Sequence, residues 1–194
     1  MRILTDRCTG CTLCALDCPY GALEMVARDD GRPHKYVARE LPDRCVSCGI
    51  CVGSCDVLAV TLGQTMPENL LGLMGVQAAA TLRAAVSPAS SIPLDPAQLR
   101  GARVVFTCER HAAQGARPYL DGRRTPADGP AVIITLPCAG AAPPDLLGRA
   151  LEAGAASVRV VGCPPDDCAN REGTTWAEQR LTRQRLPRLR RAYT

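Results

Sequence analysis

Two stretches near the start of the sequence decide the fold of its first third. Residues 8–19 read CTGCTLCALDCP, and residues 45–56 read CVSCGICVGSCD. Each stretch places four cysteines at the spacing C-x2-C-x2-C-x3-C, so residues 1–62 contain an internal duplication. The two runs hold eight of the twelve cysteines of the chain.

This spacing predicts two iron–sulfur centres. The first three thiolates of a run hold one cluster, and in the bacterial two-cluster arrangement the fourth cysteine ligates the other cluster. Two zinc sites are the alternative, but zinc uses C-x2-C pairs in groups of four, which complete four-cysteine runs fit poorly. The predicted ligands are Cys8, Cys11, Cys14 and Cys55 for one [4Fe–4S] cluster (set I) and Cys45, Cys48, Cys51 and Cys18 for the other (set II).

Residues 1–62 resemble the bacterial-type two-[4Fe–4S] ferredoxin family. The resemblance implies an α+β ferredoxin-type domain that carries two clusters. Asp56 stands where this family usually has proline, and its negative charge would lower the potential of the nearby cluster. Between the runs, the turn residues 29–32 (DDGR) predict a hairpin that joins Ala22–Val26 to Lys35–Ala38.

The composition excludes several classes of protein. Among 194 residues, twelve cysteines favour either disulfides or metal sites. The N-terminal sequence MRILTDRC has no apolar signal core, which argues against secretion and disulfides. The longest uncharged apolar run, Asn69–Leu82, is shorter than the roughly 20 residues that span a bilayer. We therefore expect a cytoplasmic metal-binding protein whose membrane association, if any, comes through partners.

Positive charge is concentrated towards the end of the chain. The net charge is +4, and seven arginines lie between Arg171 and Arg191. This tail predicts a solvated basic helix face, with a docking surface for an acidic partner as the alternative. Nucleic-acid binding is not expected, because the tail has only Trp176 and Tyr193 as aromatic residues. Trp176 is predicted to be a packing residue.

The sequence predicts a connector and a second domain after the ferredoxin-type domain. Residues 63–100 lack cysteine and predict a helix at Pro67–Val86 followed by a loop at Ser87–Pro93. Residues 101–194 predict a small α/β domain with a parallel sheet, because strands alternate with helices. The predicted strands are Ala102–Thr107, Ala131–Leu136 and Ser157–Gly162, with a loop between the first two, and the predicted helices are Pro144–Ala153 and Thr174–Arg185.

The last four cysteines follow the ends of these predicted strands. Cys108, Cys138 and Cys163 each come at or just after a strand end, and Cys168 lies on the loop after the third strand. Because the carboxyl ends of parallel strands meet at one edge, the four thiols are expected to converge. Four thiolates fit a [2Fe–2S] cluster, a [4Fe–4S] cluster or zinc, and four buried structural cysteines are the remaining alternative.

Four segments here resemble the delta subunit family of methyl-viologen-reducing hydrogenase. They read FTCERH at 106–111, LPCAG at 136–140, GCPPDDC at 162–168 and REG at 171–173. The resemblance implies a [2Fe–2S] cluster on Cys108, Cys138, Cys163 and Cys168 (the C-terminal set). It also implies electron transfer between a hydrogenase or formate dehydrogenase and a flavin-containing subunit of the heterodisulfide-reductase type.

The segments depart from the family pattern at two positions. His111 stands where the family often has a second cysteine, and Ala141 replaces a common arginine. His111 is therefore either a group near the third cluster, with ligation as one option, or a loop histidine.

The predicted function is that of an electron-transfer subunit of a larger redox complex. No G-x-G-x-x-G motif is present, so the sequence gives no nucleotide or flavin fingerprint. The alternatives are a free ferredoxin-type carrier or redox sensor, and an input subunit to a membrane cytochrome or quinone module. An enzyme whose chemistry occurs at the C-terminal cluster is a further alternative.

Overall fold

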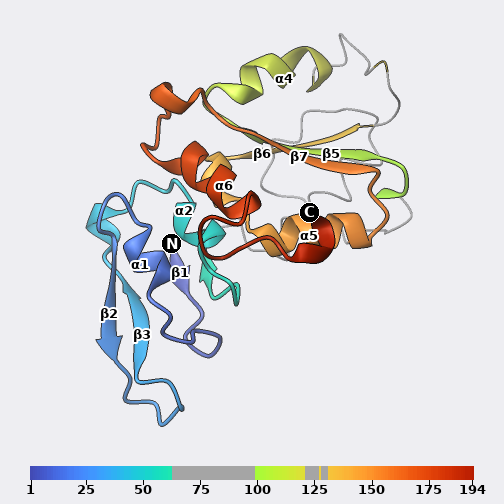
Figure 1. Cartoon of the computed structure of the whole chain (residues 1–194). Helices are drawn as coiled ribbons and strands as arrows, with labels where there is room; N and C mark the ends of the chain where they lie inside the picture. Colours follow the sequence, from blue (N-terminus) through green and yellow to red (C-terminus); the bar gives the residue numbers. More distant parts are fainter. Residues whose placement is uncertain (63–98, 121–126, 128–130) are drawn as a thin grey trace.

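The computed structural model describes residues 1–62, 99–120, 127 and 131–194. It has an N-terminal part, residues 1–62, and a C-terminal part, residues 99–194, which pack against each other (Figure 1). The predicted helix at Pro67–Val86 and loop at Ser87–Pro93 lie outside the described residues. Within the described ranges, no helix is long and apolar enough to cross a membrane.

The N-terminal part consists of two antiparallel strand pairs and two very short helices. The hairpin β2–β3 places Met25 opposite Ala38 and confirms the predicted hairpin. Three of its four strand ends lie one residue from the predicted position, and the fourth lies two residues away. The elements are β1 (Arg2–Ile3), α1 (Leu13–Leu16), β2 (Leu23–Ala27), β3 (Tyr36–Glu40), the 3₁₀-helix η1 (Pro42–Arg44), α2 (Ile50–Gly53) and β4 (Val60–Thr61).

The internal repeat seen in the sequence is also a repeat of backbone conformation. The residues on either side of the second cysteine have positive φ in both runs: Gly10 and Thr12 in the first, Ser47 and Gly49 in the second. This left-handed conformation favours glycine, and a non-glycine residue adopts it only where the surroundings hold it. Both runs therefore wind in the same way before their short helices, α1 and α2, begin.

The C-terminal part is built on a parallel sheet of three strands in the order β6-β5-β7, which confirms the predicted parallel sheet. α4 covers one face of this sheet and α5 the other (Figure 1). The elements are β5 (Arg103–Cys108), α4 (Ala112–Leu120), β6 (Ala131–Leu136), η3 (Ala139–Ala141), α5 (Pro144–Glu152), β7 (Ser157–Val161), η4 (Pro165–Asp167), α6 (Gly173–Leu181) and η5 (Arg191–Tyr193).

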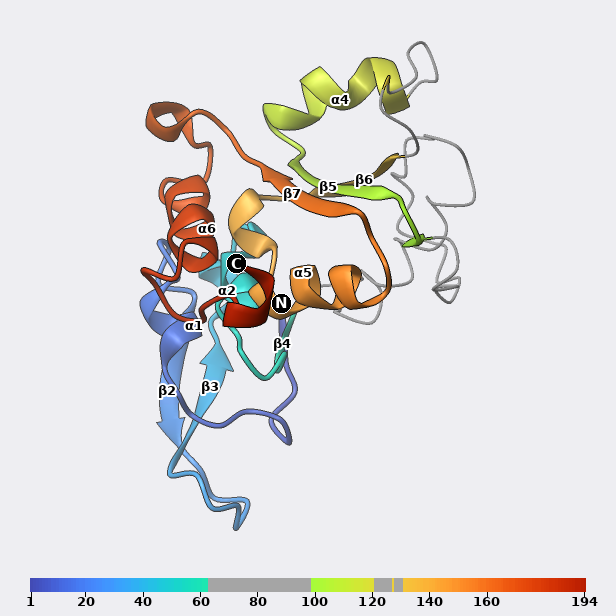
Figure 2. The ribbon, with the colours of Figure 1, turned by 45° about the vertical axis from the view of Figure 1, so that its right-hand side comes forward.

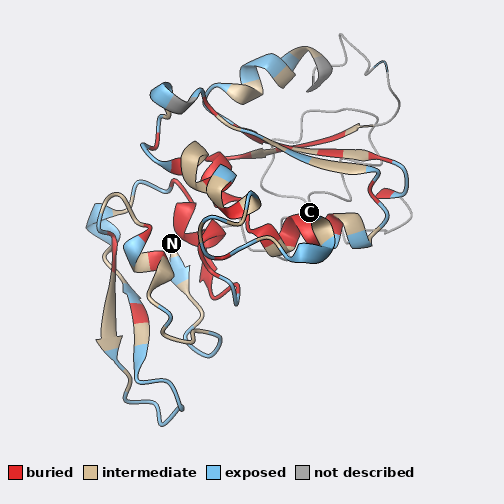
Figure 3. Cartoon of the chain, in the orientation of Figure 1, coloured by how far each residue is buried: buried red, intermediate tan, exposed pale blue. Residues whose placement is uncertain are grey.

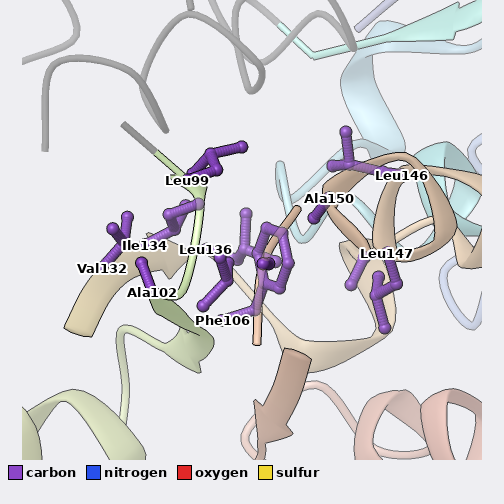
Figure 4. Packing of buried hydrophobic residues seen from close by; sticks show 12 residues of the cluster. Leu99, Ala102, Phe106, Val132, Ile134, Leu136, Leu146, Leu147 and Ala150 are labelled. Atoms are coloured by element: carbon purple, nitrogen blue, oxygen red, sulfur yellow. The ribbon is translucent and has the colours of Figure 1, made fainter. Parts of the chain in front are cut away.

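The main core lies between the sheet and α5. One buried cluster contains alternate strand residues, including Val104, Phe106 and Ile134, together with Leu146 and Ala150 of the helix. Figure 4 shows the last four of these residues. All five are at most 2% exposed. This packing fixes the carboxyl ends of the strands, where the cysteines lie.

The opposite face of the sheet is covered by α4, where the sequence predicted only a loop. Gly115 and Pro118 lower the helix propensity of this segment, so its local sequence does not indicate a helix. A parallel crossover needs a covering element, and a helix is the usual one. The cover is loose, since Val105, Ile133 and Ala116 are among the residues that line a cavity of about 480 Å³ beneath α4.

The last helix is shorter than predicted and ends at Leu181 instead of Arg185. Its end is a Schellman turn: the N–H of Gln184 donates to the carbonyl of Gln179 at 2.7 Å, and Arg183 has a φ of 66°. Arg183 occupies the position that usually holds glycine, so no glycine marks the helix end. The predicted basic helix is therefore mostly an irregular tail that turns back over α6.

Candidate metal centres

The four thiols of set I surround one small cavity in the N-terminal part. Cys8, Cys11, Cys14 and Cys55 all line it, together with apolar side chains from β1, β2, β3 and the segment before β4. Burial, together with the neighbouring Cys55, Cys11 and Cys8 thiols, raises the pKa of the Cys14 thiol to about 12. Four thiols facing one cavity fit a cluster with four thiolate ligands.

The thiols of set II also lie close to one another. Burial raises the pKa of Cys51, and the nearby thiols of Cys48, Cys14, Cys18 and Cys45 add to this shift. Three of these four neighbours belong to set II, and Cys14 belongs to set I, so the two sets are adjacent. The structure thus brings Cys18 towards the second run, and it brings Cys55 towards the first.

Backbone donors reach the fourth cysteine of each run in the same way. The N–H of Ala22 donates to Cys18 Sγ at 3.2 Å, and the N–H of Ala59 donates to Cys55 Sγ at 3.1 Å. In both runs the donor follows its cysteine by four residues. Such hydrogen bonds stabilise thiolate ligands and tune the potential of a bound cluster.

The four cysteines of the C-terminal set converge at the carboxyl edge of the sheet. Cys108 ends β5, and its Sγ lies 3.5 Å from Cys163 Sγ beyond β7. Burial raises the pKa of Cys138 to about 12, and the thiols of Cys168 and Cys108 act in the same direction. Three of the thiols are 4% exposed or less, and Cys168 is partly exposed.

Cys168 lies in a cradle of hydrogen-bond donors at the start of α6. Burial alone would raise its pKa, but backbone N–H groups of Thr174, Asn170 and Gly173 outweigh burial and lower the pKa overall. The Thr174 hydroxyl also donates to Cys168 Sγ at 3.7 Å. A cradle that stabilises a thiolate at a helix N-terminus fits an anionic metal ligand.

Gly173, the first residue of α6, packs directly against the C-terminal set. A Cβ atom there would collide with Cys138 Sγ and lie 3.6 Å from Cys168 Sγ. Any larger residue would therefore push the Cys138 thiol aside.

His111 lies beside the C-terminal set on the loop after β5. Its Nε2 is 3.7 Å from Asp167 Oδ2, and 45% of its side chain is exposed. This contact links the loop after β5 with η4, whose next residue is Cys168.

Among the described residues, no three His, Cys, Asp or Glu side chains are close enough to hold a single metal ion.

Comparison with protein families gives two matches. A family model for a 4Fe-4S dicluster domain matches residues 7–59, and a model for the delta subunit of methyl-viologen-reducing hydrogenase matches residues 104–186. The chain joins a dicluster domain to a hydrogenase delta-subunit domain. No curated protein and no solved structure gives a significant match. The two family matches support an electron-transfer protein with [4Fe–4S] chemistry.

The dicluster domain and the delta-subunit domain meet through α2. All four residues of α2 are buried, and the helix lies beside α6 (Figures 2 and 3). A Cβ atom on Gly53 would collide with the carbonyl oxygen of Gly140 in η3. The close approach of these two backbones therefore depends on glycine in the dicluster domain.

A buried ion pair joins the two domains at the same place. Arg180 of α6 donates to Asp17 Oδ2 at 2.7 Å, to Ser54 Oγ at 2.6 Å and to the carbonyl of Gly140 at 2.9 Å. Arg185 also pairs with Asp17. The prediction of a solvated arginine face is therefore wrong for Arg180, which is 0% exposed.

The sequence interpretation missed the residues that connect the domains. Asp17 and Ser54 each precede the fourth cysteine of a run, so Arg180 binds equivalent positions of the two repeats. That equivalence was visible in the sequence, but the partner of these residues was not. Trp176, predicted as a packing residue, packs between the domains against a buried cluster of Cys48, Ile50 and Cys138.

Proposed function

We propose that this chain is an electron-transfer subunit that carries three iron–sulfur clusters. Sets I and II would each hold a [4Fe–4S] cluster, and the C-terminal set would hold a [2Fe–2S] cluster. The observation that carries this proposal is the buried cluster of Cys48, from set II, and Cys138, from the C-terminal set. Two thiol sets that share one dry contact are suited to exchanging electrons.

The residues of the chain prepare each site for an anionic cluster. Bound clusters would accept and release one electron each. The N–H groups of Ala22 and Ala59 would stabilise the thiolates of Cys18 and Cys55. Burial of Cys14 and Cys51 excludes water from the sites, so the potentials depend on these hydrogen bonds and on nearby charges.

At the C-terminal set, four thiolates and two bridging sulfides around two ferric ions would give a net charge of about −2. A buried charge of this size needs compensation. The donors around Cys168 supply part of it, and the N–H of Arg110 donates to Cys108 Sγ at 3.4 Å. These donors would stabilise an anionic cluster at this set.

The partners we propose are subunits of a larger redox complex. The matched family is a delta subunit, which supports membership of a multi-subunit enzyme. A hydrogenase or a formate dehydrogenase would be the donor or acceptor on one side, and a flavin-containing subunit would be the partner on the other.

The size of the native protein tests this proposal. We expect the chain to co-purify from its native source, without denaturants, in a complex far larger than 20.6 kDa that also contains a flavin or hydrogenase-type subunit. A 20.6 kDa monomer with a full complement of clusters would instead identify a free carrier.

A further inference from the structure

The segments that carry Cys18 and Cys168 touch each other directly. Tyr20 follows Cys18 by two residues, and its hydroxyl donates to Asn170 Oδ1 at 3.3 Å. Asn170 follows Cys168 by two residues and is only 8% exposed. Its side chain also lowers the pKa of the Cys138 thiol, so its amide group lies near that thiol. The hydrogen bond between Tyr20 and Asn170 therefore connects the end of the first cysteine run with the C-terminal set.

Arg171 fixes Tyr20 in this position. Its Nη1 donates to the carbonyl oxygen of Pro19 at 3.0 Å, and its guanidinium carbon lies 5.2 Å from the centre of the Tyr20 ring. A hydrogen bond to the backbone and a cation–π contact from one side chain restrict both the ring and the chain that carries it. The consecutive residues Asn170 and Arg171 thus both bind the segment that follows Cys18.

The space around this contact is apolar. Cys48, Ile50 and Cys138 are at most 9% exposed, and Tyr20 and Trp176 pack against them. A dry contact of this kind holds donor and acceptor groups at fixed separation and removes water that would otherwise reorganise.

Set I lies away from this contact. Among the described residues, those that line its cavity all belong to the dicluster domain, and Cys11 is exposed. Cys55 does approach the delta-subunit domain, at Pro143 and Pro144, but these residues carry no redox group. Set I is therefore placed to exchange electrons with a separate molecule.

We infer that the contact of Tyr20 with Asn170 is the electron junction between the two domains, with set II inside and set I at the outer end. This inference rests on the proposed clusters. With clusters bound, one electron would pass between the C-terminal set and set II, in either direction. No bond is made or broken, and no proton is needed. Tyr20, Asn170 and Arg171 are positioning residues for this step.

The first test removes a single hydroxyl from the cluster-loaded full chain. Tyr20→Phe keeps the ring but loses the hydrogen bond to Asn170, so we expect electron equilibration between the C-terminal and set II centres after photoreduction to slow severalfold. Tyr36→Phe is the matched control, because Tyr36 lies in the hairpin and is 52% exposed. Equal rates in the wild type and both variants would overturn the role of Tyr20.

The second test fixes the order of the centres. Cys45→Ala removes a ligand of set II, and we expect it to isolate the set I centre from the C-terminal centre. Fast equilibration in Cys45→Ala, with loss of its set II signal verified by EPR, would overturn the order.

Iron and sulfide analysis of each protein distinguishes a failure of the proposed function from a failure of the proposed junction. Absence of clusters from the wild-type chain contradicts the proposed function itself. Full cluster content with a rate unaffected by Tyr20→Phe contradicts only the junction. Asn170→Ala adds a spectroscopic readout, because removing a polar amide group near the Cys138 thiol should lower the midpoint potential of the C-terminal centre.

Discussion

Arg180 Nη2 lies 2.7 Å from Asp17 Oδ2, although 163 positions separate the two residues in the sequence. The Arg180 and Asp17 side chains are 1% and 3% exposed, so this ion pair is buried between the two domains. Burial alone would raise the pKa of Asp17, but hydrogen bonds from Arg185, Arg180 and Ser54 hold it below its usual value. The pair therefore keeps Asp17 ionised next to Cys18.

Breaking this pair should loosen the contact between the domains. Arg180→Met removes the charge that compensates Asp17, and losing one partner of a buried pair costs about 3–5 kcal/mol. The remaining contact with Arg185 places the expected loss at the lower end of that range. Native-state hydrogen exchange of the α2 and η3 amides measures this free energy.

Arg191→Ala is the control for that experiment, because Arg191 is an exposed arginine of the same tail. It should leave the protection of α2 and η3 unchanged. Protection that is unaffected by Arg180→Met would show that the ion pair does not hold the domains together.

Gly53→Ala should also disturb the contact, through packing instead of charge. The added methyl group would collide with the carbonyl oxygen of Gly140 and lie 2.8 Å from Arg180 Nη1. Overpacking of this kind costs about 1–3 kcal/mol. Thermal unfolding of the variant should begin at a lower temperature than that of the wild type.

Gly115→Ala is the matched control for Gly53→Ala. Gly115 lies in α4, and an added Cβ would meet nothing within 4 Å. Alanine is the better helix former by about 0.5–1 kcal/mol, so this variant should be slightly more stable than the wild type. Equal destabilisation by both changes would contradict the close approach of Gly53 to Gly140.

The exchanged fourth ligands predict opposite effects for two single substitutions. Cys18→Ala should damage the set II cluster, and Cys55→Ala should damage the set I cluster, because we propose that each cysteine ligates the cluster of the run in which it does not lie. EPR of the reduced variants, with the two [4Fe–4S] signals assigned, distinguishes the two patterns. Loss of the set I signal in Cys18→Ala would refute the exchange.

The arginine tail divides into residues that bind the chain itself and residues that face solvent. Arg188 and Arg191 are exposed, whereas Arg180 and Arg171 bind the dicluster domain. Replacing Arg188 and Arg191 by glutamine should weaken binding to an acidic partner and reduce the salt dependence of that binding. The visible spectrum should stay the same, and a loss of cluster absorbance would contradict this division.

The sequence predicted the sheet well because its strands are marked by local pattern. β6 spans the predicted residues Ala131–Leu136. α5 ends just before Gly154, the glycine that marks the helix end in the sequence and that has a φ of 96°. The end of α6 was missed because Arg183, not glycine, adopts the left-handed conformation there. α4 was not predicted because its own composition does not favour a helix. The crossover between the parallel strands β5 and β6 is what requires one there.

The candidate ligands were visible in the sequence, but their connection was not. Cysteine spacing and predicted strand ends were enough to predict the three groups of thiols, since both depend on neighbouring residues. The contact of Arg180 with Asp17, and that of Tyr20 with Asn170, joins positions about 150 residues apart or more. Nothing in either local sequence indicates such a partner, so the junction between the domains required the fold.

The most direct test of the central claim is iron and acid-labile sulfide analysis of the full chain together with Mössbauer spectroscopy. The account predicts about ten iron atoms and about ten sulfides per chain, as two [4Fe–4S] clusters and one [2Fe–2S] cluster. Cys163→Ala should lose only the two-iron component. Eight iron atoms in both proteins, with zinc or no metal on the C-terminal set, would contradict the account, because the electron path would then end in the dicluster domain.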